Sequence, residues 1–242
     1  MKLILNAPYS KNLHLKILQE TIKHSDDIVN LSPIRWLQDP LAEYKKNSDW
    51  KKFEDIRKRI ETLDVVEMKD AYDMFGALFN VNLGIYYITK KGGFEYEIDP
   101  LVKKVVNKCL EIAGLPAETY TEQKNAVVIK QMTNPNRRTA YNLCSNAVGY
   151  KNKNSLDDKK QMCIVFGTSE EAENFRKSTE TKMYRFCVKC ILTNENVVCC
   201  YKYLPFMPTY EHPWTDEMLY EYFGLTEDEV NEIERSFSFY FN

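Results

Sequence analysis

The sequence lacks an excess of basic residues. Its 33 Lys and Arg are offset by 35 Asp and Glu, giving a formal net charge of −2 and a pI near 6.0. Proteins that bind nucleic acid tightly on their own usually carry a clear basic excess. The composition therefore argues against tight autonomous DNA binding, although a local basic face is compatible with it.

Long apolar runs and a recognisable leader are also missing. No stretch approaches the ~20 apolar residues of a membrane span. The opening MKLILNAPY is too short for the apolar part of a signal peptide and has no small-residue cleavage site. The seven cysteines are odd in number and are not spaced like those of a secreted, disulfide-bonded scaffold. We therefore expect a cytoplasmic protein.

Glycine is scarce, with 8 in 242 residues. A phosphate or dinucleotide cradle needs glycines at fixed spacing between a strand and a helix. The four Gly-containing pairs that we considered lack that spacing and context: Phe75-Gly76, Gly92-Gly93, Phe166-Gly167 and Phe223-Gly224. No cofactor cradle is therefore recognisable in this chain.

The N-terminal third predicts strand, helix and strand in close succession. Met1 to Asn6 and Asp27 to Leu31 are apolar enough for buried strands, and residues 13–22 carry one apolar helical face. Short joints between these elements imply a parallel crossover. In such sheets ligands bind outside the carboxyl ends of the strands, where the polar turns after Leu5 and Leu31 fall.

Further elements follow along the chain. We expect a helical pattern from Ser48 to Thr62, then strands at Asp64 to Lys69 and Leu83 to Thr89. A helix is expected from Asp99 to Ala113. Two capping boxes, Thr168 with Glu171 and Thr226 with Glu229, predict the starts of later helices.

The turn Asn6-Ala7-Pro8-Tyr9 carries the most specific chemistry. Methylation of an exocyclic amino group needs acceptors that hold the nitrogen, and an Asn side-chain oxygen and the next main-chain carbonyl can supply them. A following aromatic ring can stack on a base removed from its duplex, and proline stiffens the turn.

This turn resembles the [DNS]-P-P-[YFW] signature of the adenine-N6 and related amino-group DNA methyltransferases. Three later segments resemble, in order, other parts of the restriction-modification type enzymes: Val29 to Pro40, the next strand and turn; Ala71 to Thr89, the following hairpin; and Lys202 to Glu234, the C-terminal end. The resemblance implies an α/β fold, with a partial Rossmann-like methyltransferase sheet followed by an α+β target-recognition-like region.

The resemblance assigns a role to each residue of the turn. Asn6 would accept a hydrogen bond from the adenine amino group, and the carbonyl of Ala7 would accept the other. Pro8 would hold the turn, and Tyr9 would stack on the flipped base. Phe79 would offer a second stacking face.

Two departures from the family pattern matter. Ala7 stands where the family usually has proline, but the expected contact uses the backbone carbonyl, which alanine keeps. The family also binds S-adenosylmethionine on an earlier strand and F-x-G-x-G turn, and only five residues precede Asn6. We therefore expect S-adenosylmethionine to bind only with a partner chain that supplies that half.

This division suggests residues 1–98 as a partial catalytic domain and 99–242 as a target-recognition-like and C-terminal helical region. A half sheet would leave its first strand with an open edge, and open edges invite pairing. We expect a second chain, a homo-oligomer or a rearranged strand to cover that edge.

Arg137 and Arg138 form a basic spot that either contacts DNA phosphate or is simply solvated.

Metal chemistry is not expected. Cys187-x-x-Cys190 with Cys199-Cys200 does not have a standard zinc spacing, and the resemblance implies direct methyl transfer without a metal. The histidines, at positions 14, 24 and 212, are expected to be satisfied or exposed.

Three functions are compatible with the sequence. The first is a subunit or remnant of a site-specific adenine-N6 DNA methyltransferase, with the methyl donor on a partner. The second is a catalytically inactive DNA-binding, regulatory or decoy protein derived from such an enzyme. The third is a purely structural interaction module.

Overall fold

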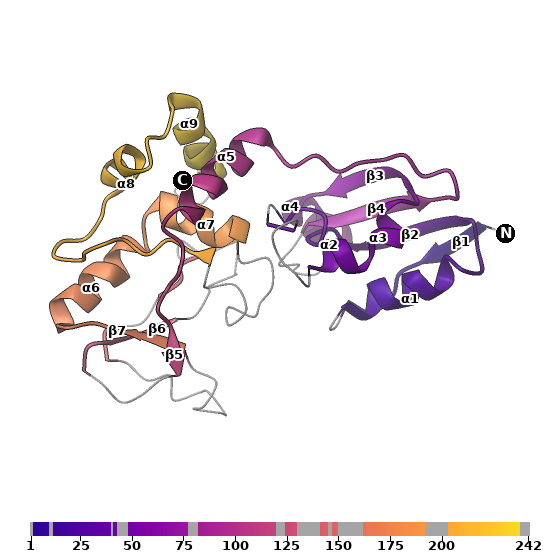
Figure 1. The fold of residues 1–242 in the computed structure, drawn as a ribbon. Coiled ribbons are helices and arrows are strands. Elements are labelled where there is room, and N and C mark those ends of the chain that lie inside the picture. The colour runs from indigo at the N-terminus through magenta and orange to yellow at the C-terminus, as the bar shows by residue number, and fades with distance from the viewer. Residues whose placement is uncertain are drawn as a thin grey trace. The chain divides into compact units, whose positions relative to one another are not determined.

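The computed structural model describes residues 2–9, 12–39, 41–42, 48–76, 82–119, 124–129, 141–144, 147–149, 162–191 and 203–237. Contacts divide the chain into two compact units, Met1–Ile98 and Asp99–Asn242, and we treat each by itself (Figure 1). Among the described residues, no helix has the length and apolar character needed to cross a bilayer.

The first unit is built on a mixed four-stranded sheet. Its strands are β1 (Lys2–Leu5), β2 (Asp27–Pro33), β3 (Ile60–Val66) and β4 (Leu83–Ile88), in the order β1-β2-β4-β3. β1 and β2 are parallel, and helix α1 (Leu13–Thr21) connects them. The expected parallel crossover is thus confirmed. β4 runs antiparallel to both of its neighbours.

Apolar side chains of α1 and of two short helices, α2 (Asp49–Lys52) and α3 (Glu54–Arg57), pack on one face of the sheet. This core includes Leu15 and Leu18 from α1, Ile56 from α3, and Ile28 and Ile88 from the sheet, all at most 1% exposed. Helix α1 forms because its apolar residues recur at helical spacing, which presents one stripe to the sheet.

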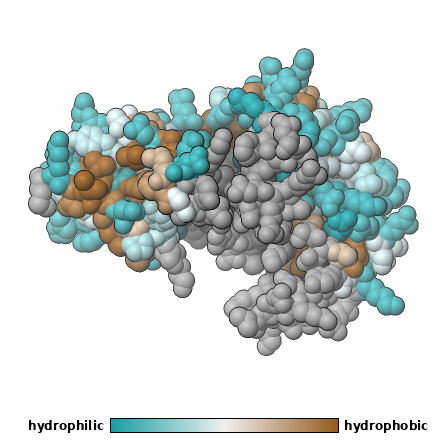
Figure 2. Space-filling view, turned by 180° about the vertical axis from the view of Figure 1, so that it is seen from behind, coloured by the Kyte–Doolittle hydropathy of each residue, from teal (hydrophilic) through white to brown (hydrophobic). Residues whose placement is uncertain are grey.

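The opposite face of the sheet is only partly covered. Helix α4 (Met68–Phe75) contributes Ala71 to a small cluster with Val66 and Leu83 near the carboxyl ends of β1 and β2. Farther along this face Ile4 is 84% exposed and its neighbour Val29 is 36% exposed. Figure 2 shows hydrophobic surface gathered on this unit, at the left of the view.

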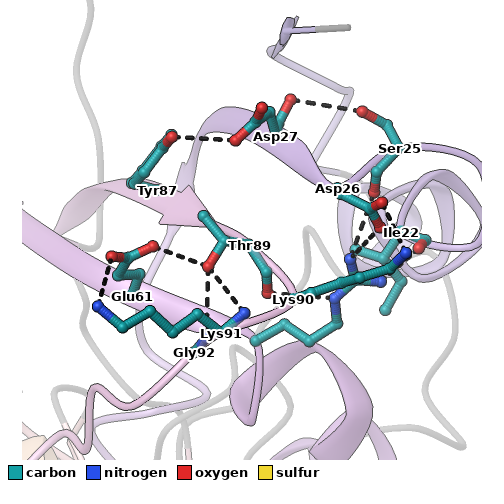
Figure 3. Close-up of polar contacts among 11 residues, drawn as sticks. Ile22, Ser25, Asp26, Asp27, Glu61, Tyr87, Thr89, Lys90, Lys91 and Gly92 are labelled. Atoms are coloured by element: carbon teal, nitrogen blue, oxygen red, sulfur yellow. Dashed lines mark hydrogen bonds and ion pairs between the residues drawn. The ribbon is translucent and has the colours of Figure 1, made fainter.

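A polar cluster closes the other end of the sheet (Figure 3). The Thr89 hydroxyl donates to Glu61 at 2.7 Å and accepts from the backbone N–H groups of Lys91 and Gly92. Gly92 has φ +58°, and a Cβ there would lie 1.9 Å from the carbonyl oxygen of Lys58. Only glycine fits this turn, which fixes the chain after β4 against the start of β3.

The second unit combines a small antiparallel sheet with helices. Its strands β5 (Glu118–Thr119), β6 (Ala126–Ile129) and β7 (Met162–Val165) pair in the order β5-β7-β6. The helices are α5 (Pro100–Leu110), α6 (Ser169–Ser178), α7 (Lys182–Ile191), α8 (Asp216–Tyr222) and α9 (Glu227–Phe237). The expected α/β class is confirmed: the structure has a mixed sheet with helices, then a smaller antiparallel sheet and a helical C-terminal region.

Three expected elements differ from those of the structure: the helical pattern from Ser48 to Thr62, the strand from Asp64 to Lys69 and the hairpin from Ala71 to Thr89. β3 begins at Ile60, inside the expected Ser48–Thr62 helical pattern, and ends at Val66, so Lys69 lies in α4 instead of a strand. The segment expected to be a hairpin, Ala71 to Thr89, contains the end of α4, and β4 pairs with β3. The start and end of β3 are set by its hydrogen bonds with β4. Local sequence patterns do not encode this pairing, because the two strands are separated in the sequence by α4.

A buried carboxylate joins α9 to α5. Glu229, 3% exposed, accepts from Lys108 Nζ at 2.7 Å and from the Thr226 N–H at 2.9 Å. Lys108 also donates to the Gly224 carbonyl at 2.7 Å. Burial pushes the pKa of Glu229 upward, but the Lys108 and Thr226 contacts outweigh it and leave that pKa below its ordinary value. The expected Thr226–Glu229 capping box is thus confirmed, with Lys108 as its third member.

Glu229→Gln should lower the free energy of unfolding by about 1–3 kcal/mol at neutral pH, because it removes a charge-assisted bond from a buried site. Since the pKa of Glu229 is lowered on folding, this contribution is complete above the unfolded-state pKa. It fades as the pH falls through the folded-state pKa. Urea denaturation at several pH values measures it. The control is Glu227→Gln, at an exposed residue of the same helical turn; equal losses for both variants would contradict the role of Glu229.

Candidate functional site

The turn Asn6-Ala7-Pro8-Tyr9 lies where expected, directly after the parallel strand β1. The last paired residue of β1, Leu5, stands opposite Asn30 of β2. Asn6 and Pro8 are exposed, Ala7 is 6% exposed, and Tyr9 is half-buried. The turn is therefore held at its buried alanine and presents the Asn6 side chain to solvent.

Asn6 and Tyr9 meet in one environment. The Tyr9 hydroxyl donates a hydrogen bond to Asn6 Oδ1 over 2.9 Å. Burial raises the pKa of Tyr9, which keeps the phenol protonated and able to donate. An amide oxygen has two lone pairs, so Asn6 Oδ1 can accept from a second donor while Tyr9 is bound.

Two elements fix the Tyr9 ring. It packs against the Val66, Ala71 and Leu83 cluster beneath α4. It also meets the His14 ring of α1 edge-on, with centroids 5.6 Å apart and 80° between the planes. Such edge contacts favour one ring orientation over others. Tyr9 is therefore a positioned aromatic group at the carboxyl end of the parallel strands.

His14 is a buried histidine, 4% exposed, and its Nδ1 has no hydrogen-bond partner among the described residues. Burial lowers its pKa to about 4, and a hydrogen bond with the Tyr9 main chain offsets only part of that effect. The expectation of a satisfied or exposed side chain is met only in part at this position, because one ring nitrogen has a partner and the other has none among the described residues. Its place with Leu15 and Leu18 on the buried side of α1 is the sequence signal that was missed.

A second buried polar group lies beside the turn. Asn30 is 1% exposed; its Nδ2 donates to Ser32 Oγ at 2.8 Å, and its Oδ1 has no partner among the described residues. Near it, Trp36 Nε1 donates to the Tyr86 hydroxyl at 3.1 Å, and that hydroxyl donates to the Pro33 carbonyl. Sequence reasoning missed Asn30, although a polar residue at every second position of a buried strand is a recognisable signal.

Other expected site residues cannot be placed. Phe79, Arg137 and Arg138 lie outside the described residues, as do Cys199 and Cys200. Within the described ranges, no group of three or more His, Cys, Asp or Glu side chains is arranged to hold a metal ion.

The described glycines of the first unit do not form a cofactor cradle. Gly76 follows α4, Gly84 lies within β4, and Gly92 and Gly93 follow β4. None of these sits between a parallel strand and its helix, where a backbone must approach a nucleotide closely. The described glycines of this unit thus do not form the turn that would hold S-adenosylmethionine.

Comparisons with known proteins found no match. No protein-family model, no curated protein and no solved structure matches this chain.

The buried His14 should make stability depend on pH. Its folded-state pKa lies below its ordinary value, so between about pH 6.5 and pH 4 the unfolded chain binds a proton that the folded chain does not. The free energy of unfolding should fall as the pH falls through this window, by up to ~1.4 kcal/mol per pH unit. His14→Phe should remove this part of the slope.

Urea unfolding of wild type and variant across the window measures the difference. His24→Phe is the control, because the His24 side chain is 75% exposed. Parallel pH profiles for wild type and His14→Phe would contradict the assignment.

Proposed function

We propose that this chain is the adenine-binding part of an adenine-N6 DNA methyltransferase of the restriction-modification type, acting in the cytoplasm with a partner chain that holds S-adenosylmethionine. The observation that carries the proposal is the pairing of Asn6 with Tyr9 at 2.9 Å, in a turn at the carboxyl end of a parallel strand. An acceptor for an amino group and a ring for stacking are thus supplied by one turn.

The chemistry follows from these groups. The amino nitrogen of adenine is a weak nucleophile because its lone pair is delocalised into the ring. Asn6 Oδ1 and the Ala7 carbonyl would accept its two hydrogens and hold the lone pair toward the methyl donor. Tyr9 would stack on the base once it leaves the duplex, a contact worth ~1–3 kcal/mol.

In the resting chain the Tyr9 hydroxyl occupies one acceptor position of Asn6. Adenine would either take the second lone pair or displace the phenol. The ring needs no large movement in the first case, since His14 and the α4 cluster already hold it. Phe79 as a second stacking face, and Arg137 and Arg138 at phosphate, complete the proposed site.

The partner chain would supply what the described residues do not. S-adenosylmethionine contributes an electrophilic methyl group, and nothing described in the first unit fits it. β1 is an edge strand, and no described strand pairs with its outer side. Next to that edge lie the exposed Ile4 and Val29. We place the partner, either a second kind of chain or another copy, along this edge.

Catalysis is tested by methyl transfer from radiolabelled S-adenosylmethionine to adenine-containing duplex DNA, with the chain alone and with candidate partners that bind the donor. The chain alone should show neither transfer nor calorimetric binding of the donor. With the right partner, Asn6→Ala should reduce transfer at least ~100-fold, since it leaves an N–H donor of the adenine amino group without its acceptor in the transition state, a loss that costs several kcal/mol. Tyr9→Phe should keep transfer, and Tyr9→Ala should lose most of it.

Asn107→Ala is the matched control, because Asn107 is exposed on α5. Full activity of Asn6→Ala would show that the site is assigned wrongly. No transfer with any partner, together with Asn6-dependent binding of adenine, would favour the inactive regulatory or decoy protein.

The same mixture tests the partner surface. Ile4→Glu should prevent formation of the complex in sedimentation experiments while leaving the fold intact, because Ile4 is 84% exposed. Val65→Glu is the control on β3, the opposite edge strand of the same sheet, where Val65 is 41% exposed. A complex that survives Ile4→Glu and is lost with Val65→Glu would place the partner at the edge formed by β3 and would contradict its proposed place at β1.

A further inference from the structure

Two buried thiols in the second unit lie against each other. Cys109 of α5 and Cys187 of α7 are both 0% exposed, and their sulfur atoms are 2.7 Å apart. A disulfide bond is ~2.05 Å long, so closing one here needs a movement of well under 1 Å. The two residues are 78 positions apart in the sequence. Packing of α5 on α7 thus brings distant thiols to bonding range.

The thiols are protected while the helices stay packed. Burial, followed by the contact with Cys109, raises the pKa of Cys187 well above its ordinary value. The thiolate is the reactive form, so a folded Cys187 reacts slowly. One turn farther along α7, Cys190 is only partly buried, and burial raises its pKa to about 12. Reaction therefore requires the α5–α7 contact to open transiently or during folding.

We propose that Cys109 and Cys187 form a reversible disulfide that links α5 to α7 when the chain meets a low-molecular-weight disulfide. One cysteine thiolate attacks the small disulfide, forms a mixed disulfide and releases one small thiolate. The second cysteine thiolate then attacks the protein sulfur of the mixed disulfide and expels the other. Two protein thiols are oxidised, and one small disulfide is reduced to two small thiols.

The consequence is a redox-dependent stability of the second unit. In a compartment rich in thiols the pair stays reduced. Once closed, the bond restricts a long loop of the unfolded chain and should raise the unfolding midpoint by ~10 °C. Because the bond is buried, a reductant should reverse it slowly in the folded protein and quickly in denaturant. This inference does not depend on the proposed methyltransferase function.

The test is oxidation of the full chain with oxidised glutathione in mild denaturant, followed by removal of both. Thiols counted after denaturation should fall from the seven of the sequence to five. Peptide mapping should find one crosslink, between Cys109 and Cys187. The oxidised chain should melt ~10 °C higher than the reduced chain.

Cys109→Ser should form no internal crosslink at Cys187 under the same treatment, and any thiol that it loses there should be found as a mixed disulfide with glutathione. Cys144→Ser, at another fully buried cysteine, is the control and should fall from six thiols to four with the same crosslink. Mapping of the wild-type chain decides the question even if a variant fails to fold. Seven remaining thiols, or a bond joining any other pair such as Cys187 with Cys190, would overturn the proposal.

Discussion

The parallel ladder between β1 and β2 is the constraint on which the proposed site depends. Four residue pairs, from Lys2 with Asp27 to Leu5 with Asn30, set where β1 ends and the turn begins. Parallel neighbours need a crossover, and α1 supplies it. That crossover brings His14 against Tyr9. One short ladder thus places the turn Asn6-Ala7-Pro8-Tyr9 and the His14 ring that contacts Tyr9 at the same end of the sheet.

This arrangement puts the proposed chemistry on the least supported strand. Among the described strands β1 has a neighbour on one side only, which leaves an open edge, and its length of four residues is a feature that limits unwanted pairing there. The exposed Ile4 has the opposite effect and favours association, because an apolar residue beside an open edge is stabilised when another chain buries it. In the proposed assembly, the partner that brings the methyl donor would also stabilise the strand that carries Asn6, which would couple assembly to activity.

Much of the local structure could be predicted from the sequence, because it is encoded in neighbouring residues. The capping boxes at Thr168 and Thr226 are confirmed, as are β1, α1 and β2. The pairing of β3 with β4, which α4 separates in the sequence, could not be predicted, since it depends on contacts between residues distant in the sequence. The same holds for the contact between Cys109 and Cys187. The meeting of Asn6 with Tyr9 followed from their spacing in one turn, whereas its use in catalysis is a proposal.

The most direct measurement is an NMR titration of the ¹⁵N-labelled chain with two short single strands. One contains adenine and the other N6,N6-dimethyladenine, which stacks but cannot donate from its amino group. If Asn6 accepts that donor, the adenine strand shifts the Asn6 side-chain amide and binds ~10-fold more tightly, as two modest hydrogen bonds allow. Equal binding of both strands, or shifts that leave Asn6 and Tyr9 untouched, would contradict the central claim.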